Sequence, residues 1–361
     1  MSRRFLLVVG ILLVLSSVGL VRPAGAASAH PGAVRAGISS KEYPIPTTNS
    51  YPAGITAGPD GNLWFIEANG AKIGRMTPKA IFQEYPVSTD KCAPNDCGLE
   101  NITVGPDGNL WFTETLGNRI GRITLTGVIT EFVIPTSSSY PEDITAGPDG
   151  NLWFTESDGN KIGRITPLGV ITEFLLPDPG SYPNSITKGP DKALWFTESG
   201  VNKIGRITSR GAISEYVVPP SLHGAISKYA RPPQNSDLTG IVTGPDGNLW
   251  FTEFNVGKIG RITRHGVITE YLVPSHSSGP SPCGITAGPD GNLWFTEFYA
   301  DMIGRITPDG AVTEFQLSGG SLRHQPRYGL GGITAGPLKS IWFTEGYTNR
   351  IGQAIPLHRT A

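Results

Sequence analysis

Residues 144–174 read ITAGPDGNLWFTESDGNKIGRITPLGVITEF, and this stretch decides the fold because its pattern recurs along the chain. The shared phrase is I-T-x-G-P-D-G-N-L-W-F-T-E, then four residues, then K-I-G-R-I-T-x-x-G-x-I-T-E-F. Seven copies occur, spaced 42 to 55 residues apart, a repeat length typical of β-propellers. Each copy holds one of the seven tryptophans: Trp64, Trp111, Trp153, Trp195, Trp250, Trp294 and Trp342.

Each copy is predicted to form four short strands. In the quoted copy they are residues 144–146, 152–156, 161–166 and 170–174. The first two are joined by a tight turn, Pro148 to Asn151, in which Gly150 supplies the positive φ. Four antiparallel strands repeated seven times predict an all-β, seven-bladed β-propeller.

The two ends of the repeat array predict how the ring closes. The seventh copy stops at residues 351–356 without a fourth strand, while residues 41–46 match the missing T-E-F-x-x-P strand. We therefore expect the N-terminal strand to complete the last blade, which leaves few open strand edges. An open solenoid would instead need distinct capping repeats. The predicted propeller domain is 41–356, preceded by a short linker at 30–40 and followed by a tail at 357–361.

Composition excludes several classes of protein. The 361-residue chain has 29 Lys and Arg against 30 Asp and Glu, so its net charge of −1 gives no reason to expect nucleic-acid binding. Gly (47) and Pro (31) leave few windows long enough for helices, which excludes a helix-rich fold. A near-neutral propeller has no forced partner, and a monomer is expected.

Residues 1–29 have the layout of a secretory signal. Arg3 and Arg4 precede an apolar run from Phe5 to Val21, and A-x-A cleavage sites end near residues 26 and 29. The alternative is an uncleaved anchor, since 17 apolar residues could just cross a bilayer. Cleavage predicts a secreted or extracytoplasmic protein with no stable membrane span.

The three cysteines fit an oxidising compartment. Cys92 and Cys97 bracket four loop residues and are predicted to form a small disulfide. Cys283 is then left over, as either a buried or a reactive thiol.

The strand order predicts a rim on which one face of the propeller could bind a ligand. The first strands begin, and the second strands end, on the face that also carries the variable connections between blades. Polar residues precede the first strand in blades two to four: Glu100, Asn101, Glu142, Asp143, Asn184 and Ser185. Long connections add further candidate ligand-binding residues: Tyr229, Arg231, Arg327 and Tyr328.

Three of these rim residues are also candidate metal ligands. Glu100, Glu142 and Asp143, with neighbouring neutral oxygens, could hold Ca²⁺ or Mg²⁺. The alternative is a hydrated acidic rim. The sequence contains no Ser-His-Asp set, phosphate loop or H-E-x-x-H pattern.

Repeated polar residues are predicted to be structural. Every W-F-T-E phrase ends in a glutamate, and six third strands carry an arginine, which Gln353 replaces in the seventh. A residue present in every blade is expected to pair with that arginine or to cap a strand end. The tryptophans are expected to pack between blades.

The G-P-D-G-N-L-W-F-T-E and N-K-I-G-R-I-T-x-x-G-x-I-T-E-F phrases resemble the repeat of the streptogramin B lyases, also called virginiamycin B lyases. The resemblance covers residues 41 to 356. It implies a seven-bladed propeller in which a Mg²⁺ ion and a histidine base open a cyclic depsipeptide antibiotic by elimination, a form of antibiotic resistance.

The resemblance also implies histidines that this sequence does not have at the corresponding positions. In active members, two first strands begin with Pro-His-x-Ile. The seven corresponding residues here are Ala53, Glu100, Glu142, Asn184, Thr239, Cys283 and Gly331. Loop histidines His223, His276 and His324 are the remaining candidates for a general base, which needs reach rather than a fixed sequence position. His265 is predicted to lie on the opposite face.

Two functional hypotheses follow. The first is a secreted, lyase-like enzyme that acts on a small cyclic peptide with a divalent metal. The second is a non-catalytic extracytoplasmic scaffold that binds a peptide, glycan or protein on its loop-rich face, since fold alone does not fix function.

Overall fold

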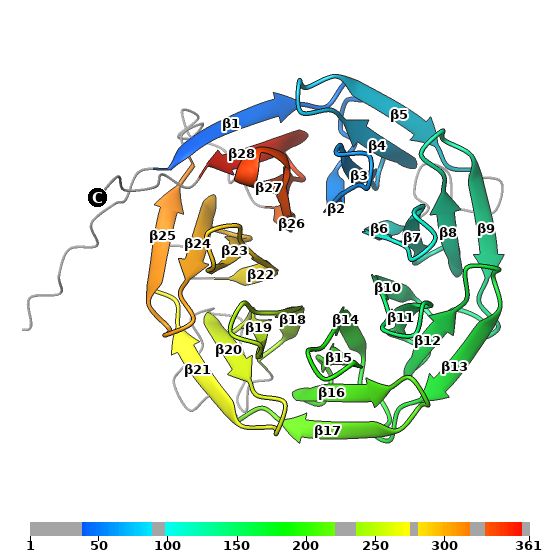
Figure 1. The fold of residues 1–361 in the computed structure, drawn as a ribbon, viewed down its shortest axis with the longest axis vertical. Helices are drawn as coiled ribbons and strands as arrows, with labels where there is room; N and C mark the ends of the chain where they lie inside the picture. The colour runs from blue at the N-terminus through cyan, green and yellow to red at the C-terminus, as the bar shows by residue number, and fades with distance from the viewer. Residues whose placement is uncertain (1–37, 89–97, 221–235, 275–280, 318–328, 356–361) are drawn as a thin grey trace, which may run out of the picture. The chain divides into compact units, whose positions relative to one another are not determined.

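A computed structural model describes residues 38–88, 98–220, 236–274, 281–317 and 329–355. The chain divides into Met1–Val34 and a compact unit, Arg35–Ala361, to which every described residue belongs. The described residues form seven four-stranded antiparallel sheets, which confirms the predicted seven-bladed propeller (Figure 1). Among these residues, no helix has both the length and the apolar character needed to span a membrane.

Each of the first six blades runs from an innermost to an outermost strand in chain order. Their bounds are β2 (Pro52–Ala57), β3 (Leu63–Glu67), β4 (Lys72–Met76), β5 (Phe82–Pro86); β6 (Leu99–Val104), β7 (Leu110–Glu114), β8 (Arg119–Ile123), β9 (Ile129–Val133); β10 (Pro141–Ala146), β11 (Leu152–Glu156), β12 (Lys161–Ile165), β13 (Ile171–Leu175); β14 (Pro183–Lys188), β15 (Ala193–Glu198), β16 (Lys203–Thr208), β17 (Ile213–Val217); β18 (Leu238–Thr243), β19 (Leu249–Glu253), β20 (Lys258–Ile262), β21 (Ile268–Leu272); β22 (Pro282–Ala287), β23 (Leu293–Glu297), β24 (Met302–Ile306) and β25 (Val312–Gln316).

The seventh blade combines the two ends of the described chain. It contains β26 (Leu330–Gly336), β27 (Ser340–Glu345) and β28 (Arg350–Ile355), with a short 3-10 turn at Pro337–Lys339, and its outermost strand is β1 (Ser39–Pro44). Ser39 pairs with Ile355 and Pro44 with Arg350, so the N-terminal strand closes the ring as predicted. The strand begins at Ser39, two residues before the predicted boundary, because its pairing with β28 extends to Ile355. The innermost strands β26 and β2 lie side by side, as do those of the other neighbouring blades.

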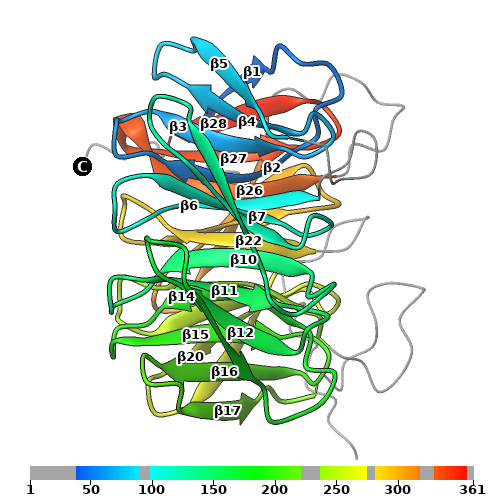
Figure 2. The same cartoon turned by 90° about the vertical axis from the view of Figure 1, so that its right-hand side faces the viewer.

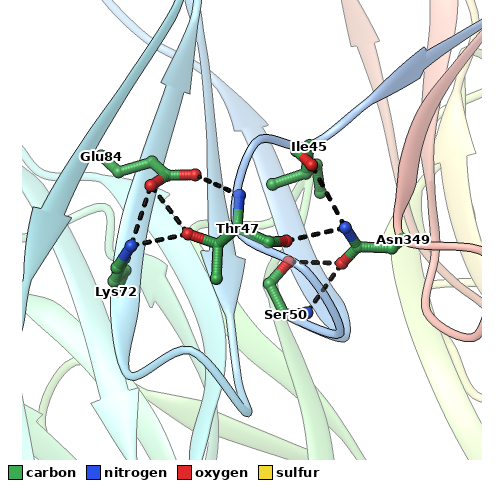
Figure 3. Close-up of polar contacts among 6 residues, drawn as sticks. All are labelled: Ile45, Thr47, Ser50, Lys72, Glu84 and Asn349. Carbon is green, nitrogen blue, oxygen red and sulfur yellow. Dashed lines mark hydrogen bonds and ion pairs between the residues drawn. The ribbon is translucent and has the colours of Figure 1, made fainter.

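An asparagine side chain fastens the ring where the last blade meets the first. Asn349 Oδ1 accepts hydrogen bonds from the backbone N and the Oγ of Ser50, both at 2.7 Å (Figure 3). Its Nδ2 donates to the carbonyl oxygens of Thr47, at 2.7 Å, and Ile45, at 3.3 Å. Because one carboxamide satisfies four backbone or hydroxyl groups of the incoming chain, it fixes the path of the segment that leads into the first blade.

The same arrangement of asparagine hydrogen bonds recurs between other blades. Asn118 accepts from the backbone N of Ser139 at 2.8 Å and from its Oγ at 2.9 Å. Asn160 accepts from the backbone N of Ser181 at 2.8 Å. The loop before each of these third strands therefore holds the start of the next blade. Figure 2 shows the strands running from one face of the propeller to the other, with the loops at the two faces.

The second strand of every blade is buried along its length, and its tryptophan packs between blades as predicted. Trp64 belongs to a core cluster with residues of the second blade. Its ring stacks on Tyr85 at 5.6 Å, the Arg75 guanidinium lies 5.5 Å from its centroid, and its Nε1 donates to Asp60 at 3.1 Å.

The predicted pairing of the repeated arginine with the repeated glutamate is wrong. Arg75 lies opposite Trp64 in the sheet and pairs with Asp60 of the Pro-Asp-Gly turn, at 3.0 Å. Glu67 lies at the other end of the strand, opposite Lys72. Glu67 lies three positions after Trp64, about 10 Å along the strand, so the arginine opposite Trp64 does not reach Glu67.

Candidate functional site

A cavity of about 390 Å³ opens at the mouth of the central channel, where the innermost strands begin. We call it the channel mouth. All six predicted rim residues within the described chain line it: Glu100, Asn101, Glu142, Asp143, Asn184 and Ser185. The structure therefore brings together side chains from three blades that are 42 residues apart in sequence.

A β-bulge aims these side chains into the channel mouth. The pairing of each first strand with its second strand shifts register just after the first residue, for example between Pro141 and Ile144. The two bulged residues there, Glu142 and Asp143, line the cavity. Bulges redirect side chains at sheet edges in this way, and equivalent register shifts occur in the other six blades.

The threonine of the W-F-T-E phrase supports the bulges of blades two to six, a role that the sequence analysis missed; the first copy has Ile66 at this position. Thr155 Oγ1 accepts a hydrogen bond from the backbone N of Asp143 at 3.0 Å and donates to the carbonyl oxygen of Asn184, in the next blade, at 2.8 Å. Thr113 makes the matching pair of bonds with Asn101 and Glu142. The recurrence of threonine at this position of the repeat was the sequence signal that could have predicted this structural role.

Asp143 joins three blades. Its Oδ1 accepts from Asn101 Nδ2 at 2.5 Å and from the backbone N of Ile144 at 2.7 Å. Its Oδ2 accepts from Ser185 Oγ at 2.7 Å and from the backbone N of Ile186 at 2.8 Å. Burial raises the pKa of Asp143 to about 6, although all four hydrogen bonds act to lower it. Both carboxylate oxygens of Asp143 are therefore already engaged in hydrogen bonds within the protein.

The described residues do not fit the predicted divalent-metal site. No group of three or more His, Cys, Asp or Glu side chains within the described ranges is arranged to hold an ion. Asp143 directs both oxygens to protein donors. Glu100 and Glu142 remain at the channel mouth as an acidic wall, and burial together with the charges of Glu100 and Asp143 raises the pKa of Glu142 to about 8.

The other side of the channel mouth is apolar. Phe298 lines the cavity and contacts Tyr299, with ring centroids 5.0 Å apart, and Phe254, at 6.0 Å. Glycines let the bulges of neighbouring blades touch on this side: a Cβ on Gly284 would lie 2.7 Å from the carbonyl oxygen of Gly331. The channel mouth is therefore divided into a carboxylate and amide half and an aromatic and glycine half.

Cys283 lies in the channel mouth as a free, half-buried thiol. Burial, with the nearby charges of Glu100 and Asp237, raises its pKa to about 12. Because the thiolate is the reactive form, Cys283 is a poor nucleophile or base at neutral pH. The raised pKa argues against the reactive alternative, although the side chain is half-buried rather than buried.

A second set of carboxyls lies beneath the rim and outside the cavity. The seven W-F-T-E glutamates are all buried, and none lines the channel mouth. Burial and a neighbouring fourth-strand carboxylate raise their pKa values, for example that of Glu67 to about 7 and that of Glu297 to about 9. Their repetition in every blade agrees with a structural role.

The loop candidates lie outside the described residues: His223, His276, His324, Tyr229, Arg231, Arg327, Tyr328, Cys92 and Cys97. The catalytic assignment and the predicted disulfide therefore stay predictions. His265 is described, and it lies in the turn between β20 and β21, on the face away from the channel mouth. No described residue lining the channel mouth is a histidine.

Comparison with known proteins gives consistent matches. A sequence profile of the virginiamycin B lyase family matches residues 41–222 and 221–355. The structure of virginiamycin B lyase from Staphylococcus aureus is 38% identical, with 89% of this chain and 100% of that chain covered, at a TM-score of 0.77. A streptogramin B lyase structure is 37% identical, with coverages of 88% and 97% and a TM-score of 0.77. A catalytically inactive histidine-to-alanine variant of the S. aureus enzyme, with quinupristin, is 37% identical, with coverages of 89% and 100% and a TM-score of 0.77.

Proposed function

Because this chain belongs to the virginiamycin B lyase family, we propose that its channel mouth binds a small amphipathic cyclic peptide. The observation that carries this proposal is the division of the channel mouth into a polar and an aromatic half. Glu100, Glu142 and Asn184 offer oxygens to peptide N–H groups, while Phe298 offers an apolar wall on the opposite side. A cavity of about 390 Å³ lies within the range of small-molecule sites.

We further propose that the described channel mouth binds this ligand without opening it. Elimination needs a base within reach of the proton it removes. Cys283 occupies one of the positions at which the family resemblance implies histidine, and its raised pKa of about 12 keeps the thiol protonated. The described residues that line the channel mouth do not fit a metal site either, so they offer no ligand set for Mg²⁺.

Lyase activity with a loop-borne base is the second candidate function, and the 37–38% identity to streptogramin B lyases favours it. His223, His276 or His324 would be that base. One experiment separates the two functions: the full chain is titrated with a streptogramin B depsipeptide, and the mixture is followed by chromatography and mass spectrometry, with and without a chelator.

Saturable binding with the depsipeptide unchanged would support a binding protein. A product of unchanged mass but altered retention would establish elimination and refute binding without turnover, whereas a gain of one water would indicate hydrolysis. Absence of saturable binding would refute the proposed ligand. Leu168→Ala is the control variant for binding, because Leu168 is 90% exposed in a turn on the opposite face.

We also propose an extracytoplasmic location, supported by the signal-like pattern of residues 1–29. Mass spectrometry of the purified protein from its native host should find an N-terminus at Ala27 or His30. An intact N-terminus on a membrane-bound protein would favour the anchor instead.

A further inference from the structure

The face of the propeller opposite the channel mouth carries a cluster of exposed cations in blades four and five. It lies where β14 turns into β15, β16 into β17 and β20 into β21. Its members, which we call the basic patch, are all exposed: Lys188, Lys192, Arg210 and Arg264. We propose that the basic patch binds the protein to an anionic phospholipid surface, with the channel mouth facing away from that surface.

Contacts between blades four and five bring the three turns together. Thr243, the last residue of β18, donates a hydrogen bond to the carbonyl oxygen of Lys188 at 2.6 Å. In the turn between β20 and β21, a Cβ on Gly266 would lie 2.3 Å from the Tyr216 ring, so this turn packs on the outermost strand of blade four. Figure 1 shows β14 to β17 next to β18 to β21. The four cations therefore share one sector of the face.

The acidic residues of these turns do not neutralise the basic patch. Asp191 pairs with Arg206 at 2.7 Å, and Asp246 pairs with Arg261 at 3.9 Å. Within the described ranges, no member of the basic patch forms an ion pair. Asp309 is exposed in the corresponding turn of blade six, which limits the patch to blades four and five. The four positive charges are thus available to an external anion.

The repeat departs from its pattern to supply two of these charges. Lys188 is the only charged residue at its position among the seven copies. Lys192 has a φ of 60°, in the left-handed region that costs free energy for any residue with a side chain. Five other copies have glycine at this position: Gly61, Gly108, Gly150, Gly247 and Gly291. Backbone strain of this kind clusters at functional sites, which supports a use for the lysine charge.

The turns suit lipid headgroups better than a nucleic acid. A cluster of four Lys and Arg residues is enough to attract anionic headgroups, which need no fixed spacing between the cations. The three turns contain no Phe, Tyr or Trp that could stack on a base. Arg264 Nε donates to His265 Nε2 at 3.1 Å, and Val267, 62% exposed, adds apolar surface beside them. A lipid interface can accept both the charges and this apolar side chain.

The two faces of the propeller differ in the sign of their charged residues. The channel mouth has Glu100, Glu142 and Asp143, and none of its described lining residues is basic. The net charge of −1 conceals this asymmetry. An anionic surface attracts the basic patch and repels carboxylates, so it orients the protein as it binds. The channel mouth would then remain open to solution.

The test measures binding to lipid vesicles by sedimentation. The protein is isolated from its native host, so that any N-terminal processing has already taken place. It is mixed with vesicles of phosphatidylcholine alone, or of phosphatidylcholine and phosphatidylglycerol in equal parts. We expect tighter binding to the vesicles that contain phosphatidylglycerol, and weaker binding as sodium chloride is added, because salt screens the charges.

The variants use residues that other copies of the repeat already have at the same positions. Lys192→Gly restores the glycine of five copies and should weaken binding to phosphatidylglycerol vesicles about fivefold. Lys188→Ala, Lys192→Gly and Arg210→Thr together should weaken it about a hundredfold. Lys339→Gly is the matched control, because Lys339 has the same repeat position in blade seven, a φ of 52° and an exposed side chain outside the basic patch.

Loss of vesicle binding in Lys192→Gly, with binding retained in Lys339→Gly, would support the basic patch. Equal affinity for the two kinds of vesicle would overturn the proposal, as would equal losses in the two variants, since the effect would then reflect overall charge. Tighter binding to a DNA duplex than to the phosphatidylglycerol vesicles, lost in the same variants, would identify a nucleic acid as the partner and refute the lipid surface.

Discussion

Replacing Glu297 with Gln should change how stability depends on pH. Glu297 is fully buried, and neither of its oxygens has a hydrogen-bond donor in the described part of the chain. It lies opposite Met302, whereas the equivalent partner in the other six blades is Lys or Arg. Burial, together with the neighbouring Glu314 carboxylate, raises the pKa of Glu297 from 4.5 to about 9.

The raised pKa determines whether stability rises or falls with pH. Between about pH 5 and pH 9, Glu297 is protonated in the folded chain and ionised in the unfolded chain, so unfolding releases a proton. The contribution of Glu297 to the free energy of unfolding is fully present below its pKa in the unfolded chain. It is lost as the pH rises towards its pKa in the folded chain. One proton corresponds to about 1.4 kcal/mol per pH unit, or about 2.7 kcal/mol from pH 6 to pH 8.

Glu297→Gln should remove this contribution because glutamine has nearly the shape of a protonated glutamate and does not titrate. Urea unfolding at intervals from pH 6 to pH 9 would measure the free energy of unfolding. We expect the variant to lose free energy with pH less steeply than the wild type, by about 1.4 kcal/mol per unit.

Glu67→Gln is the matched control. Glu67 lies opposite Lys72, and its pKa of about 7 confines its effect to pH values below about 7. Between pH 7 and pH 9, only Glu297→Gln should flatten the curve. Parallel curves for the wild type and Glu297→Gln over that interval would refute the assigned protonation state.

Three further predictions concern the Asp143 hydrogen bonds, the ring closure and the ligand. Asp143→Ala removes the acceptor of four hydrogen bonds and should lower the free energy of unfolding by about 2–4 kcal/mol in urea; a change under about 0.5 kcal/mol would contradict the role of Asp143 in joining three blades. Asn349→Ala should lower the free energy of unfolding by about 1–3 kcal/mol in the same assay. The loss should be at least as large as that for Asn118→Ala at an interior junction, and a smaller loss would argue against a special role of Asn349 in ring closure. Phe298→Ala should weaken depsipeptide binding about tenfold by calorimetry, while Leu168→Ala leaves it unchanged.

The blades were predictable from sequence because the pattern of strands and turns recurs seven times along the chain. The pairing of Trp153 with Arg164, and of Glu156 with Lys161, was not inferred, although register follows from counting outward from the turn that joins the two strands. The arginine was assigned to the wrong carboxyl because both residue types recur in almost every copy. Recurrence alone does not show which end of a strand a residue occupies.

The site was predictable in position and less so in chemistry. Counting back from the first-strand isoleucine identified the residues that line the channel mouth, such as Glu142 and Asn184. That Asp143 would direct both oxygens to donors in three blades was not predictable, because those donors, including the backbone N of Ile186, come from segments far apart in sequence. The hydrogen-bond partners of Asp143, rather than its residue type, determine that both of its oxygens already have protein donors.

The pairing of β1 with β28 has a consequence for how the chain is made. Tyr43 donates to Gln353 across 310 residues, so the last sheet cannot form until the chain has been synthesised through β28. Contacts of such separation form slowly. A chain broken off before Arg350 would display an unpaired edge on β27 and a stray N-terminal strand, both of which invite aggregation or proteolysis. Closure of the ring therefore requires a chain that extends through β28, because only then are the edges of β1 and β27 both paired with that strand.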